Sequence, residues 1–330
     1  MRLIYFFYYI KKLDKEKLKV FQKFVKAKTG QSIFKQWFVV FYHSLKYNIS
    51  ILEYYQFQFW EKSHEEKLTW AGTGYMFEYQ KVMNPPAKRD ILDDKRKFFM
   101  AYKEFFKHRV FTYDNLMQNP EYIAELKSFD KVVFKVSDGK CGIGVVFKSK
   151  HELKDIDVLN LMKVEGFDLV ETYIIQHEDL NRLSPSGVNT VRIFTQLNAK
   201  GEVEILGCRQ RISINSPVDN LAAGNIAAPI NEKTGVIDGP GVYGDITKEP
   251  EMKHPITGVD IVGFQVPFWK ECLELVDVAA KKHPQNRSIG WDIVVTENGP
   301  GLIEGNHDWC KLVWQLPVKK GLKHLLKRHL

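Results

Sequence analysis

The last pair of strands that the sequence predicts carries three oxygen-bearing side chains at a spacing suited to a metal ion. The segment WDIVVTENGPGLIEGN (291–306) indicates two strands joined by a short turn. Alternation along a strand puts Asp292 on the same face as Val294, and Glu304 and Asn306 on one face of the returning strand. Three hard oxygen ligands on rigid strands suit Mg²⁺. The sequence therefore predicts a magnesium site here, the alternative being an ordinary hairpin whose polar residues face solvent.

A second motif offers an anion-binding loop. The strand KVVFKV (131–136) leads into the glycine-rich run SDGKCGIG (137–144), after which an extended pattern resumes. Glycine lets backbone N–H groups approach a phosphate closely, because no side chain obstructs the approach. The candidate phosphate contacts are Lys135, Gly139, Lys140, Gly142 and Gly144. A plain hairpin closed by a glycine loop is the alternative for this motif on its own.

Arginines alternate with apolar residues on two further predicted strands. Arg192 lies on one strand, and Arg209 and Arg211 lie on the next. A guanidinium there could clamp a phosphate or a carboxylate with two parallel hydrogen bonds and neutralise charge during phosphoryl transfer. We assign this role to Arg192 and Arg211. The competing interpretation is a structural ion pair with Asp219 or Glu204.

The elements that position these residues indicate an α+β fold. Apolar residues recur at helical spacing through 11–60, and the breakers AGTG and NPPAKRD predict a boundary within 70–90. Antiparallel strands with a few helices follow, so we expect a helical N-terminal subdomain over 1–80 and an α+β domain over 81–330. The expected strands are 131–136, 145–147, 169–175, 189–197, 202–212, 289–296 and 301–306. The expected helices are 93–108, 151–163 and 267–283.

The composition is that of a globular cytoplasmic protein. The chain has 330 residues, of which 44% are hydrophobic, enough for a sizeable core. Its four cysteines are scattered, which argues against a zinc knuckle or a disulfide framework. The opening MRLIYFFYYI is apolar for only about ten residues, too short for a spanning helix. No small-residue cleavage site follows it, so we expect a cytoplasmic location.

The net charge of +8 is concentrated at the two ends of the chain. Residues 1–60 hold 11 Lys or Arg against three acids, and residues 311–330 hold six against none, so the middle is acidic. This distribution gives no reason to expect nucleic acid as a partner. Solvated lysines over an aromatic helical core are the simplest interpretation of the N-terminal segment. A peripheral contact with the anionic inner face of a membrane is the alternative.

The predicted metal hairpin resembles that of the ATP-grasp superfamily, in which an Asp is followed on the next strand by Glu-x-Asn. Short segments narrow the resemblance to the sugar-transfer-associated branch: NTVR (189–192), VDN (218–220), HPITG (254–258), IGWD (289–292) and LIEGN (302–306). A coarser likeness runs from Asp93 to the end, whereas the first 70 residues show none. The resemblance implies an ATP-grasp domain over 81–330, with a nucleotide lobe at about 93–180 and a metal and acceptor lobe at about 181–330.

The resemblance also implies a nucleotide site. Asp292, Glu304 and Asn306 would hold one or two Mg²⁺ ions against the phosphates of ATP. Lys135 and Lys95, the latter with Lys97 as its competitor, would contact these phosphates. The adenine would be held by backbone groups of Glu171, Thr172, Tyr173 and Ile174, and Glu178 would take the ribose hydroxyls.

Acceptor recognition would fall to polar residues in loops over the cleft. These are Asp219, Asn220, Asn225 and His254. Relatives in this branch usually carry paired glycines after the VDN segment, where this chain has Ala223-Gly224-Asn225. We therefore expect an acceptor loop of different shape.

The activity implied by the resemblance is ATP-dependent ligation, in which a carboxylate becomes an acyl phosphate and an amine then displaces the phosphate. Relatives of this branch are associated with surface-polysaccharide assembly, which implies a small-molecule or sugar-linked carboxylate and an amine as substrates. Two alternatives stay open. One is a kinase that phosphorylates a hydroxyl or a phosphate, and the other is a non-catalytic nucleotide-binding scaffold of a polysaccharide-assembly complex.

Overall fold

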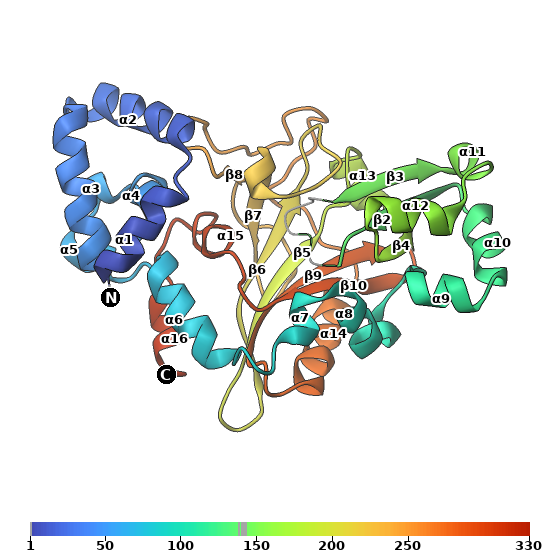
Figure 1. Ribbon diagram of the computed structural model, residues 1–330. Coiled ribbons are helices and arrows are strands. Elements are labelled where there is room, and N and C mark those ends of the chain that lie inside the picture. Colours follow the sequence, from blue (N-terminus) through green and yellow to red (C-terminus); the bar gives the residue numbers. More distant parts are fainter. Residues whose placement is uncertain (1, 138, 140–143) are drawn as a thin grey trace.

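The computed structural model describes residues 2–137, 139 and 144–330. Lys140 and Gly142, both assigned to the phosphate loop, lie outside the described residues. Figure 1 shows three parts of the fold: a group of N-terminal helices, a large twisted sheet in the middle, and a small sheet with its own helices at the opposite end. Helices and two antiparallel sheets make the α+β fold that the sequence predicts.

The N-terminal part is helical, as the apolar spacing indicates. Its elements are α1 (Arg2–Lys11), α2 (Lys15–Thr29), α3 (Ile33–Tyr47), α4 (Ile51–Gln56), η1 (Phe59–Glu61) and α5 (His64–Leu68). Capping sets their limits, since the Asp14 side chain accepts from the Lys17 N–H and Gly30 ends α2 in the left-handed region at φ 72°. Phe21 and Tyr55 are fully buried in the aromatic core between these helices. The apolar opening segment, for which the pattern predicts no element, forms α1.

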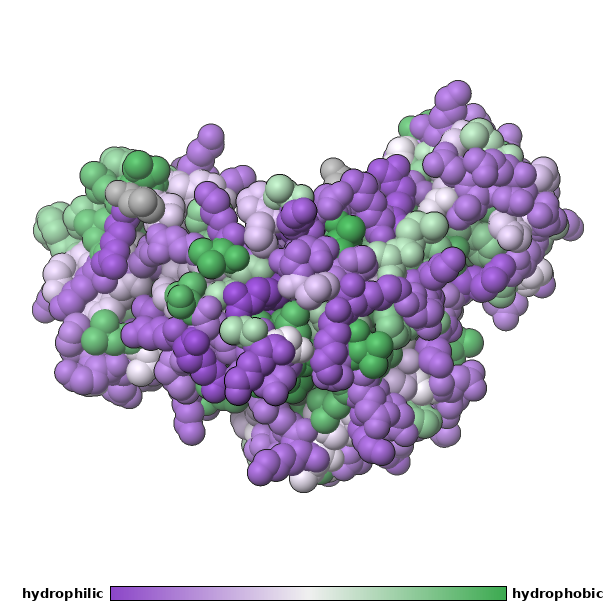
Figure 2. Space-filling model, turned by 90° about the horizontal axis from the view of Figure 1, so that it is seen from below, coloured by the Kyte–Doolittle hydropathy of each residue, from purple (hydrophilic) through white to green (hydrophobic). Residues whose placement is uncertain are grey.

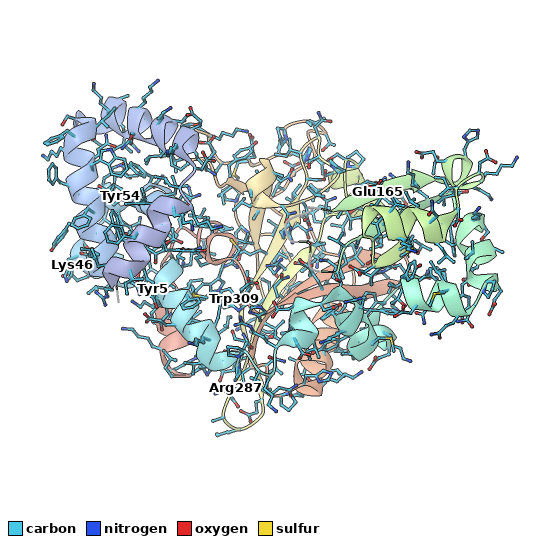
Figure 3. The ribbon with its side chains drawn as sticks, viewed as in Figure 1. Tyr5, Lys46, Tyr54, Glu165, Arg287 and Trp309 are labelled. Atoms are coloured by element: carbon cyan, nitrogen blue, oxygen red, sulfur yellow. The ribbon has the colours of Figure 1, made fainter. Side chains whose placement is uncertain are left out.

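A buried ion pair ties the N-terminal helices to the end of the chain. Glu53 of α4 is 1% exposed and lies 3.0 Å from the Lys311 Nζ. Glu53 also accepts hydrogen bonds from the Ser50 N–H and from the Thr73 N–H and hydroxyl. The segments α6 (Thr73–Met83), α15 (Lys311–Gln315) and α16 (Lys323–Lys327) then cover one face of the large sheet, around the buried Trp309 and Trp314. Figure 3 labels Trp309 between the N-terminal helices and this sheet.

The small sheet carries the predicted phosphate loop. Its antiparallel strands lie in the order β1 (Val110–Thr112), β4 (Leu169–Thr172), β2 (Lys131–Lys135) and β3 (Val145–Ser149). β2 and β3 pair from Lys131 opposite Ser149 to Lys135 opposite Val145, which confirms the predicted hairpin. One face is covered by α9 (Tyr113–Gln118), α10 (Glu121–Ser128), α11 (Lys150–Leu153) and α12 (Val158–Glu165). The helix predicted at 151–163 is two helices, because Asp157 caps a new start for α12.

The large sheet carries the predicted metal hairpin and the arginines. Its strands lie in the order β10 (Gly299–Asn306), β9 (Ser288–Thr296), β5 (Val191–Leu197), β6 (Val203–Ile212), β7 (Ile226–Ile230) and β8 (Val242–Tyr243), and all pairings are antiparallel. Ile193, Ile293 and Leu302 point to the face covered by α14 (Trp269–Lys282). Arg192 directly precedes Ile193, and Asp292 directly precedes Ile293. Because successive side chains of a strand alternate between its faces, Arg192 and Asp292 point to the opposite face.

A β-bulge in β10 decides which face Glu304 occupies. The pairing of β10 with β9 runs regularly up to Leu302 opposite Ile293, and then shifts by one residue so that Glu304 lies opposite Asp292. Without this shift Ile303 would lie opposite Asp292, and Glu304 would point into the core beneath α14. The bulge therefore puts both carboxylates on one face.

The helix predicted at 93–108 is broken, and it packs on the large sheet. It consists of α7 (Asp90–Asp93), α8 (Lys95–Tyr102) and η2 (Lys103–Phe105). The break falls at Asp94, which is extended and whose side chain accepts from the Arg96 and Lys97 N–H groups. Phe98 and Tyr102 are buried with the β9 and β10 side chains of the large-sheet core. Lys95 thus belongs to the large-sheet side of the molecule.

No helix within the described ranges combines the length and the apolar content that crossing a bilayer requires.

Candidate functional site

The structure brings the three predicted metal ligands together. Glu304 and Asp292 are in hydrogen-bonding contact across the hairpin, and the Asn306 side-chain amide donates to the Glu304 carboxylate at 3.1 Å. Asp292 is 3% exposed, and Glu304 and Asn306 are partly buried. Among the residues that the structure describes, no three His, Cys, Asp or Glu side chains form a metal cluster. Two carboxylates and one amide form a small oxygen-only site.

Two buried arginines hold Asp292 from the neighbouring strands. Arg192 donates to both carboxylate oxygens of Asp292, through Nε and through Nη2 at 2.7 Å. Arg211 donates to Asp292 Oδ2 at 3.0 Å. Burial by itself would raise the pKa of Asp292, but the two guanidinium groups outweigh it and hold this pKa well below its usual range. Asp292 is therefore ionised and rigidly oriented.

Glu304 has the opposite electrostatic environment. Burial raises the pKa of Glu304, and the neighbouring charge of Asp292 raises it further. Arg192 and Arg211 face three carboxylates here, because Asp219 also lies 2.6 Å from Arg211 Nη2. With Glu304 ionised, the cluster carries a net negative charge, which a divalent cation would reverse. This donor set fits Mg²⁺, for which carboxylate and amide oxygens are suitable ligands.

The acceptor loop is anchored to the same arginines. Asp219 accepts from the Thr190 N–H at 2.8 Å besides its pair with Arg211, and Asn220 accepts from Arg211 through its side-chain oxygen. From the sequence, a structural ion pair with Asp219 was the competing interpretation for the arginines, and Arg211 forms this pair. Arg211 therefore has two roles at once, since it holds this loop and also orients Asp292.

Asn225 and His254 hold loops in place. Asn225 is fully buried, accepts from the Ile214 N–H at 2.7 Å and donates to the carbonyl of Val218. His254 is 2% exposed and uses both ring nitrogens on backbone groups, one of them on the Ser213 carbonyl at 2.9 Å. These contacts shape the loops, and acceptor recognition by the two side chains stays a prediction.

A cavity of about 240 Å³ joins the metal hairpin, the arginines and α8. Its lining includes Lys95, Gly139, Arg192, Arg211, Asn220, Glu304 and Asn306. The Lys95 ammonium donates to the carbonyl of Gly139 in the phosphate loop. Its competitor Lys97 instead pairs with Asp90 at 2.9 Å on an exposed surface. Of the two lysines, only Lys95 lines this cavity.

The small sheet holds Lys135 against Glu171. The Lys135 ammonium lies 2.6 Å from Glu171 Oε2, and His108 Nε2 lies 3.1 Å from the same oxygen. Burial would raise the pKa of Glu171, but Lys135 and His108 lower it to about 2. The predicted phosphate lysine is therefore held by a buried carboxylate of the same sheet. At the other end of the loop, Gly144 adopts φ 72°, in the left-handed region that glycine tolerates.

Acid should reveal the contribution of Glu171 to stability. Because its pKa is depressed in the folded state, the stabilisation is present above the ordinary value of 4.5 and is lost as the pH falls toward about 2. We expect Glu171→Gln to destabilise the protein at neutral pH and the difference from wild type to shrink over that range. The measurement is the urea midpoint as a function of pH. Glu165→Gln, at an exposed carboxylate, should leave the wild-type profile unchanged, and a constant wild-type to Glu171→Gln difference across the range would refute this account.

The predicted hinge lines a second cavity, which has a volume of about 290 Å³. Tyr173, Ile174 and Glu178 are among its lining residues. The backbone N–H groups of Thr172 and Tyr173 donate to the carbonyls of Arg109 and Lys131 at 3.0 Å, so they are engaged within the small sheet. The hinge and the metal hairpin thus lie in two separate cavities of this structure. A backbone N–H donor to a base would therefore have to come from Ile174 or a residue beyond it.

Three features of the site were not expected from the sequence. Arg209 turns away from Asp292 and donates to the carbonyl of Trp314, and burial lowers its pKa to about 10. His108 shares Glu171 with Lys135. His307 Nε2 lies 2.7 Å from Asp93 Oδ1 at the wall of the first cavity. Two of the three had a sequence signal, since Arg209 alternates with apolar residues on its strand and His307 directly follows the Glu-x-Asn motif.

Two antiparallel sheets with helices, the larger sheet ending in the hairpin of Asp292, Glu304 and Asn306, form the architecture expected of an ATP-grasp protein. The chain belongs to the sugar-transfer associated ATP-grasp family, whose model matches residues 76–329. This match confirms the resemblance that the short motifs indicate, and it excludes α1 to α5. A search of curated proteins found no match.

Solved structures similar to this chain include ATP-grasp enzymes. A biotin carboxylase from Campylobacter jejuni gives a TM-score of 0.46 at 12% identity, with 74% of this chain and 48% of that chain covered. An L-amino acid ligase from Bacillus licheniformis gives 0.42 at 12% identity, covering 80% and 51%. An N5-carboxyaminoimidazole ribonucleotide synthetase, purK, in complex with ADP gives 0.41 at 13% identity, covering 66% and 45%. The chain spans about half the length of these structures.

Proposed function

We propose that this protein is an Mg²⁺- and ATP-dependent ligase that activates a carboxylate as an acyl phosphate for attack by an amine. The observation that carries the proposal is the convergence of Asp292, Glu304 and Asn306 with Arg192 and Arg211 at one cavity. Ligands for a metal and cations for an anionic acceptor occupy the same small space. Phosphoryl transfer depends chiefly on such positioning and charge neutralisation.

The metal would be held by Asp292, Glu304 and Asn306. A bound Mg²⁺ would neutralise charge on the ATP phosphates and orient them for transfer. Arg192 and Arg211 keep Asp292 ionised and hold its carboxylate in one orientation. Burial and the neighbouring charge of Asp292 raise the pKa of Glu304, and a bound cation would favour its ionised form.

The phosphates of ATP would lie between the two sheets. Lys95 would reach them from α8 and Lys135 from β2, and backbone N–H groups of the glycine-rich loop would be further donors. Glu171 would hold the Lys135 ammonium in place. The adenine would lie toward the cavity at Tyr173, Ile174 and Glu178, with Glu178 within the lining that would meet the ribose.

The acceptor carboxylate would bind toward Arg192 and Arg211, with Asn220 beside it. One of its oxygens attacks the γ-phosphorus, and the bond between that phosphorus and ADP breaks. The amine nitrogen then attacks the acyl carbon, inorganic phosphate leaves with the transferred oxygen, and the nitrogen loses a proton. The arginines stabilise the negative charge at both steps. The family description favours a sugar-linked carboxylate, and this choice rests on that description alone.

The test follows an oxygen atom. The protein is incubated with MgATP, hydroxylamine and a panel of sugar acids and amino acids labelled with ¹⁸O in the carboxylate. We expect ADP, a hydroxamate, and inorganic phosphate that carries one ¹⁸O atom from the acceptor. ADP with a hydroxylamine-resistant phosphorylated product would make the protein a kinase. ATP binding without ADP formation on any acceptor would favour the scaffold.

A further inference from the structure

The two helices α1 and α3 expose an unusual amount of apolar surface. Among the described residues, 25 large apolar side chains are exposed, and eleven of them come from these two helices. The most exposed are Ile4, Phe7 and Tyr8 of α1 and Phe34, Phe38 and Tyr42 of α3, between 54% and 73%. We call these six residues the aromatic face. Figure 2 shows apolar residues gathered at the end of the molecule that the N-terminal helices form.

The two helices form one continuous surface. Arg2, at the start of α1, donates to the carbonyls of Leu45 and Lys46 at the end of α3, so the helices run side by side in opposite directions. The rings of Phe6 and Phe41 meet edge to face with centroids 4.8 Å apart at the seam. The rings of Phe34 and Phe38, one helical turn apart, also meet edge to face, with their centroids 4.8 Å apart.

The aromatic rings of α3 are not exposed because its buried face is already filled by apolar residues. In α3 the buried face carries the polar residues Gln36 and Ser44, while the aromatic rings point outward. Gln36 donates to the carbonyls of Gln22 and Gln31 and accepts from Tyr55, and Ser44 donates to the carbonyl of Ile49. A helix whose buried face is hydrogen-bonded and whose exposed face carries aromatic rings is suited to contact an apolar surface outside the protein.

Every charged side chain on α1 and α3 is basic. Neither α1 nor α3 contains an Asp or a Glu, whereas Arg2, Lys11, Lys35 and Lys46 all lie on these helices. The neighbouring α2 adds six lysines against one acid. Amphipathic helices with aromatic and aliphatic residues on one side and lysines at the rim are attracted to anionic lipid surfaces.

We propose that the aromatic face docks on an anionic lipid bilayer, with α1 and α3 lying in the plane of the headgroups. Ten and fifteen residues are too few for either helix to span the hydrocarbon core. The face lies outside the residues matched by the family model, so it is an addition to the ATP-grasp domain. The proposal does not depend on the activity proposed above.

Docking would also orient the rest of the protein. The N-terminal helices share their core with Val242 and Leu316 of the large-sheet part, and the pair between Glu53 and Lys311 fixes them to it. A bilayer bound at α1 and α3 would therefore hold the acceptor cavity in one orientation to the lipid surface.

The test compares vesicle binding by two quadruple variants of the full chain. The first, Ile4→Ser, Phe7→Ser, Phe34→Ser and Phe38→Ser, removes apolar groups from the aromatic face only. The control, Met117→Ser, Val164→Ser, Met252→Ser and Val278→Ser, removes equally exposed groups elsewhere. Figure 3 labels Lys46, beside the face, at the left of the molecule and Glu165, next to Val164, in its right half. Binding is measured by flotation with vesicles of phosphatidylcholine alone or mixed with phosphatidylglycerol.

We expect wild type and the control to float with the anionic vesicles. The first variant should bind these vesicles at least about tenfold more weakly than wild type. Trp37, 38% exposed between the aromatic rings, should be quenched by brominated lipid, and Trp37→Tyr should lose most of this quenching. Equal flotation of both variants, or no flotation of wild type, would overturn the proposal. A wild-type dimer that the first variant abolishes, without lipid binding, would assign the face to a second copy of this chain.

Discussion

Glu304→Gln is expected to lower ATP turnover by at least about a hundredfold while leaving the thermal stability of the metal-free protein unchanged or slightly higher. Glutamine keeps the size of the side chain and loses its charge. In the folded protein the pKa of Glu304 is raised, so its ionised form costs stability once the pH rises through that pKa, and near pH 7 glutamine removes this cost. Turnover and melting temperature are measured on the same preparations.

Added Mg²⁺ tests whether the loss of turnover arises at the metal site. We expect Mg²⁺ to raise the melting temperature of wild type and to have little effect on Glu304→Gln, because a ligand that binds the folded state stabilises it. Glu202→Gln, an exposed carboxylate at the turn between β5 and β6, is the matched control and should behave as wild type. Retained turnover in Glu304→Gln would remove the metal hairpin from the mechanism.

Arg211→Met is expected to destabilise the protein by about 3–5 kcal/mol, the largest stability effect that we predict for a single substitution. Arg211 is 5% exposed and pairs with Asp219 at 2.6 Å and with Asp292 at 3.0 Å. Methionine fills part of the space but leaves a buried carboxylate, Asp219, without its cation, and Asp292 with only Arg192. The urea midpoint measures the loss.

The matched control for this loss is an exposed ion pair. Arg182 lies 3.1 Å from Asp179, and its side chain is 67% exposed. Because solvent screens such pairs, Arg182→Met should cost at most about 1 kcal/mol. Equal effects of the two substitutions would mean that Arg211 is not the electrostatic support of Asp292 and of the acceptor loop.

Much of the fold is readable from the sequence, because local patterns determine it. Helical spacing over 11–60 predicts the N-terminal helices, and glycine-separated β-branched runs predict the hairpin of β2 and β3. The limits of elements depend on single caps, and these were harder to predict. Asp94 and Asp157 each interrupt a segment that periodicity alone presents as one helix.

The candidate site is only partly predictable, because its geometry depends on pairing between distant strands. The residue types of Asp292, Glu304 and Asn306 indicate a metal, but perfect alternation would have placed Glu304 beneath α14. Only the bulge at Ile303 puts it beside Asp292. Likewise no local pattern distinguishes Arg209 from Arg211. The first donates to the backbone of Trp314, 105 residues away, and the second to Asp292.

The most direct test of the central claim is the heat of ATP binding with and without Mg²⁺, for wild type and for Glu304→Gln. Glu304→Gln is preferable to Asp292→Asn, because loss of the Asp292 charge would remove the carboxylate that the buried Arg192 and Arg211 share. The account predicts ATP binding by wild type that strengthens with Mg²⁺, and an Mg²⁺ effect that disappears in Glu304→Gln. ATP binding that is equally strong with and without Mg²⁺ in wild type, or no ATP binding at all, would contradict it.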